Sequence, residues 1–401
     1  MSTPTVEKRR TSGPDGAAAA AIPFADCWIT EPAQAAAQRV LASGWVTTGV
    51  ECTAFEAELS SYVAAPHGVA VSSCTAAIEL ALRSYGLASG TPVLTSTMTF
   101  CGAVHAIEHA GLRPVLVDVD PETGMPTTDT VARAAATCDG RPGAMVLVHW
   151  SGDVLDRAAL AAAADLPEDR VVEDAAHALG SEHRGVPIGS GAAVCFSFYA
   201  TKNLPIGEGG MVTTDDPDRA AWLRRARLHG MSQDAWRRYL PGGSWRYDVA
   251  EAGLKANLSD LQAAIGREQL AFLPAWQEAR AALAGRYDAG LRDLPGVRLP
   301  HRPAPSAGRH AWHLYAVQVD GAVSRDEVAR SLAERGVGTS VHFIPVHRLT
   351  HYSTLSPPGG LPGADLMFER LLSLPLYPRL SLDRVDDVVS ALADVLEGAH
   401  R

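Results

Sequence analysis

The sequence predicts an α/β protein, with a large domain built on a mostly parallel sheet flanked by helices and a smaller C-terminal α+β domain. From about residue 68, short apolar runs alternate with helical patterns, which is typical of βαβ units. A periodic segment from Ser259 to about Leu283 then predicts a long connecting helix, with Ser259 and Asp260 at its N-terminal cap. With 401 residues, 47% of them hydrophobic, the chain can bury the cores of two domains.

Local patterns predict each element in turn. Seven apolar runs indicate the strands of the large sheet, at residues 69–71, 93–94, 115–117, 145–148, 171–172, 194–198 and 211–213. Alanine and leucine favour helices at 75–84, 131–136 and 155–164. In the smaller domain we expect strands at 312–319 and 339–343, helices at 326–335 and 382–396, and a Pro/Gly-rich loop at 357–363. The expected division is a disordered tail at 1–21, a large domain at 22–258, and the connecting helix with the small domain at 259–401.

Composition argues against several classes of protein. The formal net charge of -10 is spread along the chain, so no basic surface for nucleic acid is expected. No apolar stretch approaches the ~20 residues of a membrane span. The basic residues 8–10 precede an alanine run at 17–21, but a Gly/Pro-containing segment intervenes, so we expect a disordered tail and not a signal peptide. Six scattered cysteines lack the spacing of a metal site, which favours reduced thiols in the cytoplasm.

An acidic residue and a lysine each follow an apolar strand. Asp174 follows the run 171–172 and Glu173, at the carboxyl end where open α/β sheets bind ligands. Lys202 lies between an aromatic strand and the glycine cluster 207–210. Partial desolvation there would lower the pKa of the lysine and make its amine nucleophilic. Taken singly, such an Asp is more often a helix cap and such a Lys a solvated surface residue.

A third element follows the first expected strand. Ser73, Cys74 and Thr75 open a helix, and the amides and hydroxyls at a helix N-terminus can bind phosphate. By itself this pattern is more often a plain N-cap. Together, however, the three elements supply a carboxylate, an amine and a phosphate cup at the carboxyl ends of strands.

This combination resembles the aspartate-aminotransferase-like fold of enzymes that use pyridoxal 5'-phosphate (PLP), the fold type I transferases. More closely, the chain resembles the DegT/DnrJ/EryC1/StrS family of sugar aminotransferases, from about residue 40 to 396. The matching motifs are GWVTTG at 44–49, TF at 99–100, VDVD at 117–120, EDAAH at 173–177, FSF at 196–198, TKN at 201–203, GEGG at 207–210, GLKAN at 253–257, QAAIG at 262–266, WHLY at 312–315 and LSLP at 372–375. The resemblance implies that the large domain binds PLP.

The resemblance also implies roles for particular residues. Lys202 would hold PLP as a Schiff base and later move a proton, while Asp174 would bind the pyridine nitrogen and keep it protonated. His177 would lie near the phenolic oxygen of PLP, and Phe100 would stack on its ring. The phosphate would be held by Ser73, Cys74 through its backbone amide, Thr75 and Ser197.

Two further sets of residues follow from the same resemblance. Lys255 and Asn257 would reach the phosphate site of a neighbouring subunit, which implies a homodimer. The acceptor substrate would contact Arg237, Arg238, Trp245 and His342, because guanidinium groups and aromatic rings suit a nucleotide diphosphate. A solvated loop at 232–247 is an equally good interpretation of that segment. The sequence departs from the family at Cys74, where a glycine is common, and at His105, where an asparagine is usual.

The expected function is PLP-dependent transfer of an amino group from an amino acid, by resemblance glutamate, to a keto sugar. A nucleotide-linked 4-keto sugar of antibiotic, other secondary-metabolite or cell-surface biosynthesis is the leading interpretation. The alternative acceptor is a cyclitol or another ring ketone without a nucleotide. A non-catalytic regulatory homologue is disfavoured because Lys202, Asp174 and Ser197 are all present.

Overall fold

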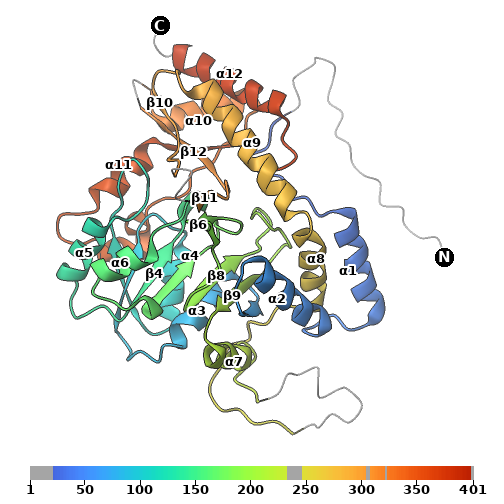
Figure 1. Ribbon diagram of the computed structural model, residues 1–401. Coiled ribbons are helices and arrows are strands. Elements are labelled where there is room, and N and C mark those ends of the chain that lie inside the picture. The colour runs from blue at the N-terminus through green and yellow to red at the C-terminus, as the bar shows by residue number, and fades with distance from the viewer. Residues whose placement is uncertain (1–20, 233–245, 304–307, 321–322, 399–401) are drawn as a thin grey trace.

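The structure is a computed structural model that describes residues 21–232, 246–303, 308–320 and 323–398. The tail predicted at 1–21 therefore lies outside the described residues, except for Ala21. The large N-terminal part and the smaller C-terminal part are joined by two helices that run along one side of the molecule (Figure 1).

A seven-stranded sheet forms the centre of the large part, in the order β1-β9-β8-β5-β4-β2-β3. All seven strands predicted from apolar runs are confirmed. Their bounds are β1 His67–Val71, β2 Pro92–Ser96, β3 Arg113–Val117, β4 Ala144–Val148, β5 Val171–Asp174, β8 Ala193–Ser197 and β9 Gly210–Thr214. β9 pairs antiparallel with both of its neighbours, and the other pairs are parallel. The carboxyl ends of β1, β8, β5, β4 and β2 therefore lie at one edge of the sheet, together with the start of β9.

Helices cover both faces of this sheet (Figure 1). On one face α3, α4 and α7 pack on alternate strand residues such as Val69 and Val71. On the other face α2, α5, α6 and α8 cover the intervening residues, for example Ala70. The helices of the large part are α1 Glu31–Ser43, α2 Val50–Tyr62, α3 Cys74–Arg83, α4 Cys101–His109, α5 Thr128–Thr137, α6 Arg157–Ala163 and α7 Pro217–Ala226. This is the expected three-layer arrangement, because strands buried on both faces read as continuous apolar runs.

The prediction of one unbroken connecting helix from Ser259 was wrong. The segment forms α8 (Asp260–Leu270) and α9 (Leu273–Leu291), with a break at residues 271–272. Pro274 explains the break, because it has no N–H and its ring would clash with the carbonyl of Leu270 in a continuous helix. The predicted cap is confirmed: Ser259 and Gln262 form a capping box at the start of α8.

The smaller part contains a three-stranded sheet in the order β10-β12-β13, with neighbours antiparallel. Its elements are β10 Val297–Arg298, β12 Tyr315–Val319, α10 Arg325–Glu334, α11 Pro362–Arg370, β13 Leu371–Leu374 and α12 Leu382–Gly398. The helices predicted at 326–335 and 382–396 are confirmed, whereas the loop predicted at 357–363 ends earlier because α11 begins at Pro362. Three short strands, β6 Glu182–His183, β7 Val186–Pro187 and β11 Gly308–Arg309, form another small sheet in the order β11-β6-β7.

Two strand predictions in the smaller part needed correction. The strand expected from residue 312 begins only at Tyr315, because Trp312 has a left-handed backbone with φ of 47°. The strand expected at 339–343 is reduced to a single bridge between Ser340 and Ser373. After that bridge the chain turns inward, and Val346 donates its backbone N–H to the carbonyl of Thr97 at 2.9 Å instead of continuing the pairing.

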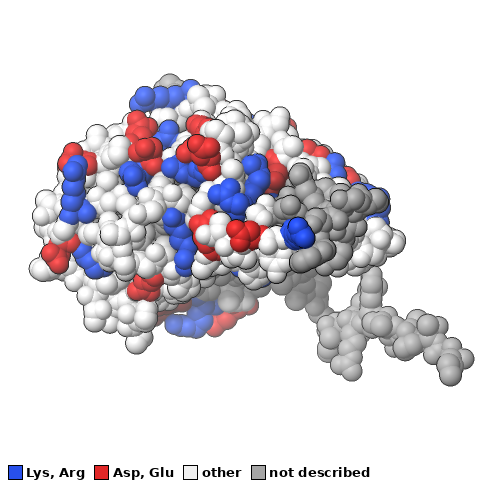
Figure 2. Space-filling view, turned by 90° about the horizontal axis from the view of Figure 1, so that it is seen from below, with Lys and Arg blue, Asp and Glu red and all other residues white. Residues whose placement is uncertain are grey.

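The surface is mixed in charge. On the face shown in Figure 2, basic and acidic side chains are interspersed. Within the described ranges, every helix is too short or too polar to cross a membrane.

One buried ion pair links three elements of the large part. Arg227, just after α7, pairs with Glu56 of α2, and both side chains also bond the backbone of Ala70 in β1. We expect Arg227→Ala to lower the free energy of unfolding by about 3–5 kcal/mol, because the Glu56 carboxylate would stay buried without its partner. Urea denaturation measures this.

Arg286→Ala is the matched control, because Arg286 pairs with Asp386 on the surface. Exposed pairs contribute little to stability. Equal effects of the two substitutions would contradict a structural role for the buried pair.

Candidate active site

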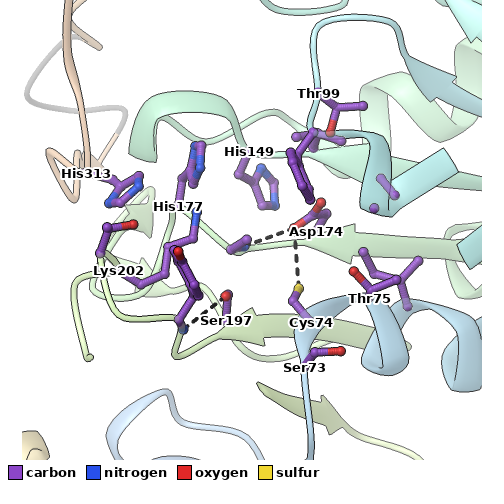
Figure 3. A pocket seen from close by; sticks show the side chains of 18 of the residues that line it. Ser73, Cys74, Thr75, Thr99, His149, Asp174, His177, Ser197, Lys202 and His313 are labelled. Atoms are coloured by element: carbon purple, nitrogen blue, oxygen red, sulfur yellow. Dashed lines mark hydrogen bonds between the residues drawn. The ribbon is translucent and has the colours of Figure 1, made fainter. Parts of the chain in front are cut away.

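A cavity of about 490 Å³ opens at the carboxyl edge of the large sheet. The ends of β1, β4, β5 and β8 and the start of α3 form one wall. His313, His342 and Phe343 of the smaller part form the opposite wall. Figure 3 shows Lys202, Asp174, Cys74, His177 and His313 around this space. The two walls therefore bring together residues that are up to 270 positions apart, counting from Ser73 to Phe343.

Lys202 lies in the turn after β8. Its backbone N–H donates to the carbonyl of Tyr199 at 2.8 Å, which fixes the turn, and its side chain reaches the cavity. Burial lowers the pKa of the Lys202 amine to about 8, against the opposing attraction of Asp174. A substantial share of this amine is therefore neutral and nucleophilic near pH 8.

Asp174 is the last residue of β5, and only 8% of it is exposed. Its Oδ1 accepts the backbone N–H of Ala176 at 3.0 Å and lies 3.7 Å from the thiol of Cys74. Burial raises the pKa of Asp174, while the Ala176 N–H and the Lys202 ammonium oppose this rise. A cationic N–H group bound in the cavity would complete the stabilisation of this carboxylate.

The turn from β1 into α3 forms an anion cradle. Ser73 caps α3 by accepting the N–H of Ala76 at 3.1 Å, and the backbone amides at the start of the helix face the cavity wall. A Cβ on Gly210 would lie 2.6 Å from the carbonyl carbon of Ser73 and 2.7 Å from the nitrogen of Cys74. Glycine at the start of β9 is therefore what allows this turn to sit against the sheet.

Four histidines line the cavity, and three of them, His177, His313 and His342, are held neutral. Burial and the nearby Lys202 ammonium keep the pKa of His177 well below its ordinary value, and burial does the same for His313. Burial, with a further contribution from Lys202, lowers the pKa of His342 to about 4. Three imidazoles without charge can donate or accept hydrogen bonds, but they cannot balance a substrate charge.

A buried group that the sequence analysis missed, His149, also lines the cavity. His149 follows β4, and its Nε2 lies 2.9 Å from Glu173, which also accepts from Arg157 at 2.7 Å. Burial alone would raise the pKa of Glu173, but the bonds from His149 and Arg157 outweigh burial and hold that pKa below its usual value. The signal that identified Asp174, a polar residue directly after an apolar strand, also applies to His149.

The remaining predicted site residues fall into three groups. Thr75, Phe100 and Ser197 line the cavity, with Phe100 61% exposed at its mouth. Lys255 and Asn257 hydrogen-bond each other away from the cavity of their own chain. Arg237, Arg238 and Trp245 lie outside the described residues.

Comparisons with known proteins agree with this geometry. Residues 28–393 match the DegT/DnrJ/EryC1/StrS aminotransferase family. The spore coat polysaccharide biosynthesis protein SpsC of Bacillus subtilis is 45% identical over 366 residues, which cover 90% of this chain and 93% of SpsC.

Solved structures are similar over almost the whole chain. The sugar aminotransferase CalS13 of Micromonospora echinospora superposes with a TM-score of 0.83 at 30% identity, covering 93% of this chain and 99% of CalS13. Spr1654 of Streptococcus pneumoniae, solved in a PLP form, gives a TM-score of 0.85 at 30% identity, covering 94% of this chain and 99% of Spr1654. The chain therefore belongs to the DegT/DnrJ/EryC1/StrS family and is a PLP-dependent sugar aminotransferase.

Proposed function

We propose that the protein transfers an amino group from glutamate to a nucleotide-linked 4-keto sugar in the cytoplasm. The observation that carries the proposal is the meeting of a buried lysine, a buried carboxylate and an anion cradle in one cavity. The spore coat polysaccharide role in the name of SpsC supports a sugar of the cell surface.

The residues present fit PLP. The amides at the start of α3 and the hydroxyl of Ser197 would hold its phosphate, at the turn that Gly210 allows to sit against the sheet. Oδ2 of Asp174 is left for the pyridine N–H, because the Ala176 N–H and the Cys74 thiol lie at Oδ1. The bound group supplies an electrophilic carbon and a ring that accepts electrons.

The side chains of this chain divide the remaining work. Lys202 Nζ would hold PLP covalently, and its amine would carry the proton that moves to or from the substrate carbon. Asp174 would keep the pyridine nitrogen protonated, Phe100 would stack on the ring, and His177 would contact the phenolic oxygen. The smaller part closes the opposite side of the cavity and keeps bulk water from Lys202.

The cavity favours an uncharged ring in the acceptor position. Among the lining residues that the structure describes, Lys202 is the one lysine or arginine. A diphosphate would therefore lie at or beyond the mouth, where we propose that Arg237, Arg238 and Trp245 of this chain contact the nucleotide. His342 would contact the sugar itself.

The function is tested with a panel of nucleoside-diphosphate keto sugars and cyclitol ketones, each incubated with glutamate and scored by the mass of the product. We expect amination of a nucleotide-linked 4-keto sugar by the native enzyme. Lys202→Ala should show neither product nor the absorption of a lysine-bound cofactor, because no other amine replaces Nζ. If a cyclitol ketone were the preferred acceptor, the cyclitol alternative would replace the nucleotide-sugar proposal.

The role of Asp174 predicts a split between binding and turnover. Asp174→Asn should lower turnover by about 100-fold or more, about 3 kcal/mol, because an amide cannot hold the pyridinium charge. The cofactor content should fall much less, since the phosphate cradle is unchanged. Single-turnover absorbance measures the turnover, and a cofactor assay measures the cofactor content.

Asp153→Asn is the matched control for Asp174→Asn. Asp153 is also buried but pairs with His301 outside the cavity lining. Its turnover should stay within a few-fold of the native value. Unchanged turnover in Asp174→Asn would refute the assigned role.

We propose a homodimer in which each chain completes the phosphate site of the other. Lys255 and Asn257 lie away from the cavity of their own chain, and Phe100 and Tyr199 at the mouth are 61% and 47% exposed in a single chain. Closed two-fold dimers are the commonest assembly of soluble proteins.

Shared sites predict complementation between two impaired variants. Lys202→Ala and Lys255→Ala chains, dissociated and reassembled together, should recover about a quarter of native activity, because half of the dimers are mixed and each mixed dimer has one intact site. Sedimentation of the reassembled mixture is the measurement that checks whether dimers have formed. An active monomer, or mixed dimers without recovery, would contradict the proposal.

A further inference from the structure

Two of the cavity histidines lie ring against ring. The centroids of His177 and His313 are 4.3 Å apart, with an angle of 38° between the rings. His177 follows β5 of the large sheet, whereas His313 comes from the segment before β12 of the smaller part. The pair thus spans the two walls of the cavity, and the hydrogen-bond partners of each ring determine what it offers a substrate.

The tautomer of His313 follows from its neighbours. The carbonyl of Ala311 can only accept a hydrogen bond, so the Asn203 amide must turn its Nδ2 toward this carbonyl, at 2.9 Å. The Asn203 Oδ1 then faces His313 Nδ1 at 3.0 Å and can only accept. His313 Nδ1 therefore carries the proton, and Nε2 of the neutral ring has a bare lone pair.

His177 has the opposite tautomer. The backbone N–H of Ser151 donates to His177 Nδ1 at 3.2 Å, so that nitrogen is the acceptor. The proton of the neutral ring is on Nε2. The two neighbouring rings therefore present a donor and an acceptor to the same cavity.

The surroundings keep His313 from becoming a cation. Burial, together with the neighbouring His177, Lys202 and Arg280, keeps the pKa of His313 well below its ordinary value. The guanidinium of Arg280 in α9 donates to the backbone carbonyls of Trp312, His313 and Leu376, at 3.1, 3.4 and 2.9 Å. His313 is thus unsuited to act as a base, but it is a fixed hydrogen-bond acceptor.

We propose that His313 Nε2 accepts a hydrogen bond from a hydroxyl group on the carbon next to the ketone of the acceptor, with Asn203 as the positioning residue. His313 interacts electrostatically with Lys202, whose Nζ marks where the ketone carbon reacts, and Figure 3 shows both side chains at the same end of the cavity. A hydroxyl supplies the donor that a bare imidazole nitrogen requires. This inference rests on the proposed function and deepens it, because it specifies a substrate that keeps its neighbouring hydroxyl.

The test compares two substrates in variants of His313. The probes are a nucleoside-diphosphate 4-keto-6-deoxyhexose and its 3-deoxy analogue. The native enzyme should favour the hydroxylated sugar by about 10- to 100-fold in kcat/KM, because the analogue leaves the lone pair unpaired. His313→Leu should lose this preference, because its kcat/KM should fall much more on the hydroxylated sugar than on the 3-deoxy analogue. The half-reaction with glutamate, measured separately, reports any general loss of activity.

Two further variants separate recognition from folding. His313→Gln places an amide oxygen within reach of the position of Nε2 and should restore part of the preference. Asn203→Leu removes the partner of Nδ1, so it should reduce the preference without abolishing it. His310→Leu is the matched control: His310 is also buried and its Nδ1 accepts from the Trp312 N–H at 2.8 Å, but it is not part of the cavity lining. It should leave the preference as it is.

The outcomes distinguish this inference from the proposed function. A His313→Leu enzyme that keeps the native preference, or that loses equally on both sugars, overturns the role of His313 while the nucleotide-sugar function stands. If the native enzyme aminates neither nucleotide sugar, that function fails. In that case the ratio of kcat/KM values is measured for an inosose and its vicinal deoxy analogue. Loss of the preference for the inosose in His313→Leu would support the inference. Persistence of that preference would overturn it.

Discussion

The removal of Lys202 and Asp174 from water is the constraint on which the rest of the site depends. Burial drives both groups toward neutrality, because it lowers the pKa of the amine and raises that of the carboxyl. Their mutual attraction offsets part of this cost. The fold must therefore bring two strand ends together and also cover them, and the smaller part provides the cover with His313, His342 and Phe343.

The same constraint explains why the lining of the cavity is so weakly charged. Once the lysine and the carboxylate are buried, further uncompensated charges would be costly. The structure uses neutral imidazoles there, each oriented by a backbone or side-chain partner. The one additional buried carboxylate behind the site, Glu173, is bonded by both His149 and Arg157.

The sequence predicted most of the large sheet because its strands are buried on both faces. Continuous apolar runs leave little ambiguity there, and the polar residues that end these runs, Asp174 and Ser197, line the cavity. Lys202, which follows the same strand as Ser197, also lines the cavity. The motif-based match extended this to the family and to PLP, which no local pattern could have supplied.

Other features could not be predicted because they depend on contacts across the fold. The break at residues 271–272 is different, because Pro274 is a local signal for it that the apolar pattern after Ser259 obscured. Residues 339–343 have the composition of a strand, yet the chain turns toward Thr97 after a single bridge. The tautomers of His177 and His313 depend on Ser151 and Asn203, which are distant in sequence.

Arg280 has a mechanical consequence. Its guanidinium ties α9 to the carbonyls of Trp312 and Leu376, on two separate segments of the smaller part. These segments cannot shift past each other without breaking bonds to a buried cation that has no carboxylate partner among the described residues. Arg280 therefore holds α9 and both segments together as one unit, so the wall that contains His313 keeps its shape.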